Sequence, residues 1–175
     1  FSSRWINSEI PGTIYYVKKE DFSGPVVEMV RTDGYTSKLN MNLDQLFDFE
    51  GKLLKCGKDL TIVSMSYMTI EAINAYDFLQ KNSICCDLID LRSIKPIDWD
   101  LIFKSVAKTG KLLVLDTGHR TCSVSSEIIS TVTEKLFEKL KEAPVRLTIP
   151  DVPEPTSFAL TKNYHNRSYH IAKVC

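Results

Sequence analysis

The hydrophobic pattern changes near Gly51 and becomes regular from Lys58 onward. Short apolar runs of strand length alternate there with longer stretches whose apolar residues recur at helical spacing. The predicted strands are 60–66, 85–91, 111–116 and 145–150, and a helix is predicted after each of the first three. This alternation favours a three-layer α/β fold, with a mainly parallel sheet and helices on both faces.

The predicted helices have recognisable ends. Asp98 is the expected N-cap of the second helix, and Gly110 is its expected stop. The third and longest helix is expected to span 125–141, with Ser125 or Ser126 as its cap. A short helix is expected near 168–174, after an extended stretch punctuated by prolines. The first helix, near 69–82, has apolar residues at Ile70, Ile73, Ala75, Phe78 and Leu79.

Residues 1–50 differ from the rest of the chain. They contain turn formers and two strand-like runs at 13–17 and 25–30, without a clear helix before Asn40. Because an isolated pair of strands is marginally stable in water, this segment is expected to need a partner surface. We interpret 1–50 as the tail of a preceding domain plus a linker, and 51–175 as the α/β domain.

Composition narrows the classes of function. Lys and Arg total 22, as do Asp and Glu, so the net charge of zero predicts no attraction to nucleic acid or membrane. The five cysteines lack a disulfide or zinc spacing, which favours reduced thiols and no metal site. Neither a membrane span nor a signal peptide is recognised, so the expected location is cytoplasmic, or an organelle matrix after processing.

The chemistry-bearing residues gather in one loop, TGHRTCSVSS, between the third strand and the longest helix. His119 and Arg120 near a helix N-terminus could hold an anion or border the substrate's approach. The alternative is a solvated loop that only caps the helix. Cys122 is disfavoured as a nucleophile because no partner for His119 is evident. No GxGxxG, GxxxxGK[ST] or GxSxG motif is present, so nucleotide-binding and hydrolase functions lack support.

Three stretches of the sequence carry a family resemblance. They are GKDLTIVSMSYMTIEAINAYDFLQKNSICCDLIDLRSIKPID, VAKTGKLLVLDTGH, and SSEIISTVTEKLFEKLKEAPVRLTIPDVPEPTSFALTKNYH. They closely resemble the C-terminal domain of the transketolase superfamily. The resemblance is greatest to the beta subunit of the first component of the 2-oxo acid dehydrogenase complexes, of pyruvate or branched-chain type. DLRSIKPID and VPEPTSFALTKNYH are its most specific parts.

The resemblance implies a division of labour. PVVEMV at 25–30 looks like the last strand of the family's pyrimidine-binding domain, so 1–50 is expected to be the tail of that domain. The thiamine diphosphate and magnesium of the parent enzyme would lie on other domains. This chain is therefore expected to have no catalytic, cofactor-binding or metal-binding residue and to be inactive alone.

The same resemblance implies a role in assembly. The family's C-terminal domain supports the dimer interface, and its C-terminal end helps to dock the acyltransferase core. Tyr164, His170 and Cys175 are the expected docking residues of the tail. The chain departs from the family's glycine-rich turn at Cys122, Ser123 and Val124, which restricts the backbone there.

Three functions follow as hypotheses. The first is the dimerisation and docking domain of a thiamine-diphosphate-dependent 2-oxo acid dehydrogenase, in a homodimer or an alpha/beta hetero-oligomer. The second is the C-terminal half of a transketolase or sugar-phosphate synthase. The third is a stand-alone regulatory module that binds an anion at His119 and Arg120. A stand-alone module should bury Trp5, Tyr15 and Tyr16 within its own fold, whereas a truncated domain should expose an apolar patch there.

Overall fold

The computed structural model describes residues 5–7, 14–17, 26–31, 36–40 and 50–175. Side chains are described from Glu50 onward, apart from Phe158, Lys162 and Asn163. The chain divides into two compact units, Phe1–Asp48 and Phe49–Cys175, and each is considered by itself.

The first unit contains a four-stranded antiparallel sheet. Its strands are β1 (Trp5–Asn7), β2 (Ile14–Val17), β3 (Val26–Arg31) and β4 (Thr36–Asn40), in the spatial order β1-β2-β3-β4. The strands β2 and β3 coincide with the two predicted runs, whereas β1 and β4 were not predicted. The side chains of Trp5, Tyr15 and Tyr16 lie outside the described residues. The origin of this segment in a pyrimidine-binding domain stays a prediction.

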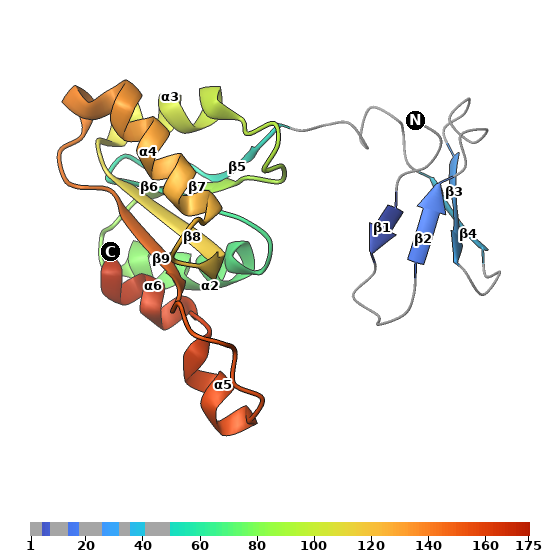
Figure 1. Ribbon diagram of the computed structural model, residues 1–175. Coiled ribbons are helices and arrows are strands. Elements are labelled where there is room, and N and C mark those ends of the chain that lie inside the picture. Colours follow the sequence, from blue (N-terminus) through green and yellow to red (C-terminus); the bar gives the residue numbers. More distant parts are fainter. Residues whose placement is uncertain (1–4, 8–13, 18–25, 32–35, 41–49) are drawn as a thin grey trace. The chain divides into compact units, whose positions relative to one another are not determined.

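The second unit is built on a five-stranded, mainly parallel sheet (Figure 1). Its strands are β5 (Lys52–Lys55), β6 (Leu60–Ser64), β7 (Cys86–Asp90), β8 (Leu112–His119) and β9 (Val145–Ile149). Their spatial order is β5-β7-β6-β8-β9, and only β5 runs antiparallel to its neighbour. β5 was not predicted, because a short and largely exposed edge strand has no apolar run.

Helices cover both faces of this sheet, which confirms the predicted three-layer α/β fold (Figure 1). The helices α2 (Tyr67–Lys81) and α6 (Ser168–Val174) pack on one face, and α3 (Trp99–Thr109) and α4 (Val124–Leu136) pack on the other. Neighbouring residues of β6 point to opposite faces, so Ile62 joins the core beneath α2 and Val63 joins the core beneath α3.

The boundaries of the helices show which local signals determine structure. Asp98 caps α3 by accepting the Leu101 N–H at 3.1 Å, and Gly110 ends it in a left-handed conformation, as predicted. α4 stops at Leu136, short of the predicted end, and a 3-10 turn, η2 (Phe137–Lys139), follows it. α6 matches its prediction. α5 (Phe158–Tyr164) was not predicted, because the nearby prolines indicated extended chain.

The strand order reverses between β6 and β8. The chain passes from β6 to its neighbour β7 through α2, and then returns through α3 to β8 on the other side of β6. Ligands of open parallel sheets favour the carboxyl ends of the strands at such a point. β8 ends at His119 at this end of the sheet, and the loop from β8 to α4 begins with Arg120. None of the helices in the described ranges is long and apolar enough to cross a membrane.

Candidate functional site

The loop between β8 and α4 is organised by a buried carboxylate, Asp116. One Asp116 oxygen accepts the Gly118 N–H at 2.8 Å, and the other accepts the Ser125 N–H at 3.0 Å. Asp116 therefore ties the end of the strand to the first turn of α4, where a negative charge also complements the helix dipole. Its position at the end of an apolar strand was the sequence signal for this role.

His119 and Arg120 are directed to different places by this loop. The His119 Nδ1 lies 2.9 Å from the Pro150 carbonyl oxygen, so its ring faces the segment that follows β9. The Arg120 side chain is exposed and lines a hollow beside α4. Between them, Thr121 donates its N–H and hydroxyl to the Asp151 carboxylate at 3.0 and 2.8 Å. The two predicted residues thus do not make one site around His119.

The start of α4 differs from the prediction in its cap. Ser123, rather than Ser125 or Ser126, caps the helix, because its Oγ accepts the Ser126 N–H at 3.2 Å. The residue before it, Cys122, has a φ of 55°, in the left-handed region. A residue with a Cβ is strained at this φ, so the turn has a backbone conformation that normally favours glycine although the residue is cysteine.

A second region of interest joins α2 to the C-terminal helix. Glu71 of α2 is only 7% exposed, and its carboxylate accepts the Tyr67 hydroxyl, the Arg167 guanidinium and the Ser168 N–H. Burial favours the neutral acid, but these three donors outweigh it and lower the pKa of Glu71. The ionised Glu71 therefore holds α6 against α2.

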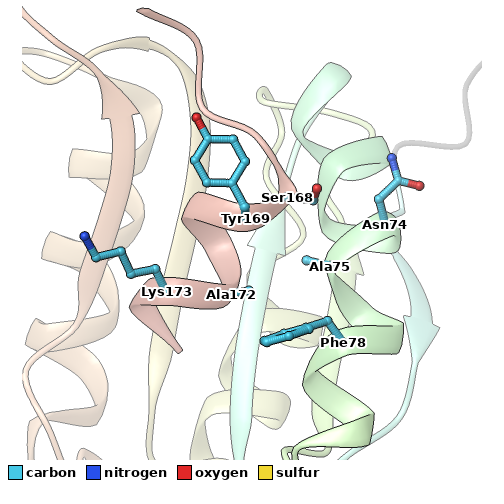
Figure 2. Close-up of a pocket in the computed structure, with 7 residues that line it drawn as sticks. All are labelled: Asn74, Ala75, Phe78, Ser168, Tyr169, Ala172 and Lys173. Atoms are coloured by element: carbon cyan, nitrogen blue, oxygen red, sulfur yellow. The ribbon is translucent and has the colours of Figure 1, made fainter. Parts of the chain in front are cut away.

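A groove runs between α2 and α6 beside this attachment (Figure 2). It has a volume of about 360 Å³, and its walls are mostly apolar. Its lining residues are Asn74, Ala75, Phe78, Ser168, Tyr169, Ala172 and Lys173. Phe78 is 56% exposed and Tyr169 is 59% exposed, so two aromatic rings border the groove in contact with solvent. Sequence reasoning did not single out this groove.

The groove was missed because the sequence pattern of α2 does not show which of its apolar residues are exposed. The predicted helix is present, but its apolar residues do not share one face: Ala75 and Leu79 are buried, whereas Ile70, Ile73 and Phe78 are exposed. The buried face also contains Thr69 and Glu71, whose polar atoms are satisfied by Asp90 and by the α6 region. Two apolar stripes on one helix were the available signal of a second contact surface.

The three predicted docking residues lie elsewhere in the tail. Tyr164 is buried, and its hydroxyl donates to the Val152 carbonyl oxygen at 2.8 Å. The His170 Nδ1 accepts the Arg167 N–H at 3.0 Å in the cap of α6. Cys175 is an exposed residue, although burial of its thiol raises the pKa of that group to about 12. Their docking role stays a prediction, and α6 instead presents Tyr169 and Lys173 to the groove.

A buried ionic network stabilises the opposite end of the sheet. Asp87 of β7 is 1% exposed, and its carboxylate accepts Lys108 Nζ and Ser105 Oγ, both at 2.6 Å, and the Gly57 N–H at 2.7 Å. It lies near the amino end of its strand, away from the switch point, which indicates a structural role. No group of three or more His, Cys, Asp or Glu side chains in the described part of the chain could hold a metal ion.

Comparisons with known proteins agree on one family. The family described as "Transketolase, C-terminal domain" matches residues 50–171. The pyruvate dehydrogenase E1 component subunit beta of Rickettsia bellii is 33% identical over 187 residues, which cover 96% of this chain and 57% of that protein. The acetoin:2,6-dichlorophenolindophenol oxidoreductase subunit beta of Cupriavidus necator is 32% identical over 123 residues, 70% of this chain and 36% of that protein.

The fold has a solved counterpart. A split gene transketolase, described as an inactive beta4 tetramer, superposes with a TM-score of 0.62 at 28% identity. The match covers 71% of this chain and 40% of that one. The chain spans about half the length of the curated relatives that it matches over most of its own length.

Proposed function

Because the chain belongs to the transketolase C-terminal domain family, we propose that it is the dimerisation and docking domain of a thiamine-diphosphate-dependent 2-oxo acid dehydrogenase. The names of its relatives, which are beta subunits of pyruvate dehydrogenase and of an acetoin oxidoreductase, support this class. The parent assembly would decarboxylate a 2-oxo acid oxidatively and transfer the acyl group to a lipoyl carrier. This chain would supply assembly contacts rather than reacting groups.

The observation that carries the docking role is the apolar surface along α2 and α6. Ile70, Ile73 and Phe78 of α2 and Tyr169 of α6 are all exposed. Phe78 and Tyr169 border one groove, and exposed aromatic rings gathered in this way mark a contact surface, because leaving them in water is unfavourable. The buried Glu71 attachment keeps α6 in place, so this surface is already formed before a partner arrives.

The proposal assigns thiamine diphosphate and magnesium to the parent enzyme and not to this chain. The assignment rests on the family resemblance, which implies that both groups lie on other domains of the parent enzyme. Titration calorimetry of the chain with thiamine diphosphate and magnesium tests this assignment. We expect no saturable heat, and binding in the micromolar range would contradict the assignment.

The partner surface can be tested through the oligomeric state. We expect the chain to self-associate and Phe78→Glu and Tyr169→Glu each to weaken association, because a buried carboxylate in an apolar contact is unfavourable. Light scattering after size-exclusion chromatography, over a range of concentrations, measures the effect. The matched control is Phe137→Glu, which places the same charge at a 72% exposed aromatic beside α4, on the other side of the sheet.

Point variants are preferable to removing the tail. Ile171 of α6 is fully buried in the core beneath α2, so deletion of 151–175 would damage the fold itself. A wild-type chain that stays monomeric throughout would count against self-association. Equal weakening by Phe137→Glu would show that the α2–α6 surface has no special role.

A second candidate function is the C-terminal half of a transketolase. The solved structure that shares the fold carries that name, which favours this candidate. The dehydrogenase and transketolase candidates differ in the molecule that accepts the transferred group. Once the chain is reconstituted with its partner chain, acylation of a lipoyl domain by a 2-oxo acid supports the dehydrogenase. Transfer between sugar phosphates without lipoyl acylation supports the transketolase.

A further inference from the structure

A hollow beside α4 combines residues from three separate elements. Its volume is about 570 Å³. The β8–α4 loop contributes Arg120, α4 contributes Ser126, Ile129 and Ser130, and the start of β9 contributes Pro144, Val145 and Arg146. β9 is the edge strand of the sheet, so the hollow lies along an open side of the domain. It is separate from the α2–α6 groove, which is on the other face.

The charged residues that line this hollow are both arginines. Arg120 and Arg146 enter it from segments that are far apart in the sequence, and no acidic side chain lines it. Arg146 Nη1 donates to the Ser126 hydroxyl, which is a neutral oxygen. Among the described residues, neither guanidinium forms an ion pair with a carboxylate. Two positive charges facing one space repel each other unless an anion lies between them.

The carboxylate of Asp151, which lies near this loop, does not neutralise the two arginines. Asp151 accepts the backbone N–H and the hydroxyl of Thr121, and these bonds lower the pKa of Asp151. Its further contact with Arg120 is through the backbone N–H of that residue. The acid in the first turn of α4, Glu127, is in contact with Thr131, which is not among the lining residues.

Two serine hydroxyl groups complete the lining, and that of Ser126 also contacts the Arg120 carbonyl oxygen at 3.4 Å and Ser123 Oγ at 2.9 Å. Ser126 and Ser130 lie one turn apart on α4, so both face the hollow. The start of α4 also carries the positive end of the helix dipole. Guanidinium groups combined with hydroxyl donors suit the tetrahedral oxygens of a phosphate group, which two arginines can bind in bidentate fashion.

We propose that this hollow binds the phosphate group of a small phosphorylated molecule, with Arg120 and Arg146 as the anion-binding residues. The space exceeds what a single phosphate needs, which leaves room for the organic part against Ile129 and Pro144. The site keeps Arg120 from the sequence prediction, replaces His119 by Arg146, and stands independently of the docking function proposed above.

Calorimetric titration of the full chain tests the proposal, in a phosphate-free buffer of low ionic strength. The probes are glycerol phosphate, inorganic phosphate and acetate at matched ionic strength. We expect saturable binding of glycerol phosphate, competition by inorganic phosphate, and no saturable binding of acetate. Binding of inorganic phosphate without glycerol phosphate, equal binding of acetate, or no binding of any probe would overturn the proposal.

Variants locate the site. Arg120→Gln and Arg146→Gln should each weaken glycerol phosphate binding about tenfold or more, because each removes a charge-assisted contact. The matched control is Lys104→Gln, which removes one positive charge from an exposed position on α3 and should leave affinity unchanged. Arg120 is exposed, so its variant should fold even if Arg146→Gln does not. Unchanged affinity in Arg120→Gln would refute the assignment.

Discussion

The Glu71 carboxylate accepts the backbone N–H of Ser168 at 2.7 Å, across 97 residues of sequence. This bond places a buried negative charge at the start of α6, where the helix has unsatisfied N–H groups. The Arg167 guanidinium and the Tyr67 hydroxyl bind the same carboxylate. The walls of the α2–α6 groove are therefore fixed relative to each other through one acidic side chain.

Substitution Glu71→Gln should loosen α6. Glutamine keeps the shape of the side chain but removes the charge and one acceptor oxygen, so the donors of Arg167 and Ser168 lose strength. We expect the free energy of unfolding of the α/β unit to fall by about 2 kcal/mol. Hydrogen exchange of the α6 amides, 168–174, should quicken. The control Asp77→Asn changes an exposed acid on the same helix and should alter neither the stability nor the exchange of α6. Equal protection of the α6 amides in both variants would show that Glu71 does not hold α6 in place.

Acid should destabilise the domain through Asp87. Burial favours its neutral form, but the bonds from Lys108, Ser105 and the Gly57 N–H outweigh burial and lower the pKa of Asp87 from its ordinary value. The pKa of Asp87 is therefore lower in the folded state than in the unfolded state. Its contribution to stability is complete at pH values above the unfolded-state pKa, and it is lost as the pH falls through the folded-state pKa. We expect stability to decline below about pH 5 in urea unfolding at a series of pH values.

The variant Asp87→Asn separates this residue from the other carboxylates. It should cost about 1–2 kcal/mol at neutral pH, because the buried side chain loses charge-assisted bonds from Lys108, Ser105 and the Gly57 N–H, although Lys108 itself remains partly in water. It should then lose less further stability on acidification than the wild type does. Parallel pH profiles for the two proteins would show that Asp87 does not contribute to the acid sensitivity.

Relief of backbone strain at Cys122 should stabilise the β8–α4 loop. The left-handed φ of 55° is unfavourable for a residue with a Cβ, and glycine adopts it without that cost. Cys122→Gly should therefore raise the free energy of unfolding by up to about 1 kcal/mol. Cys122→Ala removes the thiol but keeps the Cβ and should give no gain. A gain of the same size from alanine would assign the effect to the thiol.

Gly57 is required by a close approach of two backbones. A Cβ added there would lie 2.3 Å from the carbonyl carbon and oxygen of Cys85, a contact that backbone atoms cannot relieve without moving. The same carbonyl accepts the Lys58 and Asp59 N–H groups, both at 2.9 Å. Gly57→Ala should cost about 3 kcal/mol in thermal or urea unfolding. Gly118→Ala, whose Cβ would meet a side-chain oxygen at 3.3 Å, should cost much less.

Local signals were sufficient for most of the fold. The central strand β8 has a nearly continuous apolar run because both of its faces are covered, and such a run is visible without any partner. The cap at Asp98 and the stop at Gly110 act within a few residues, and both were predicted correctly. The edge strand β5 was missed because it is short and largely exposed, and helix α5 was missed because the nearby prolines indicated extended chain.

The candidate site was less accessible to the sequence. Arg120 was singled out for its place after a strand, but its proposed partner Arg146 lies on a different strand and looked like an ordinary strand residue. The residues of the α2–α6 groove were missed, because Phe78 and Tyr169 lie far apart in the chain. Only the tail's attachment to Glu71 places them at one surface.

The sequence by itself determined the alternation of the four parallel strands with helices, the three-layer fold and the family, because apolar periodicity, caps and family motifs act through neighbours in the chain. The tertiary structure alone decided which α2 residues stay exposed, where His119 and Arg120 point, and which distant residues meet. The physical reason is that Glu71 meets Ser168, and Arg120 lines one hollow with Arg146, only after segments that are distant in the sequence have packed together. The loop between β8 and α4 shows both levels, since its residues were evident from the chain and their separate roles only from the fold.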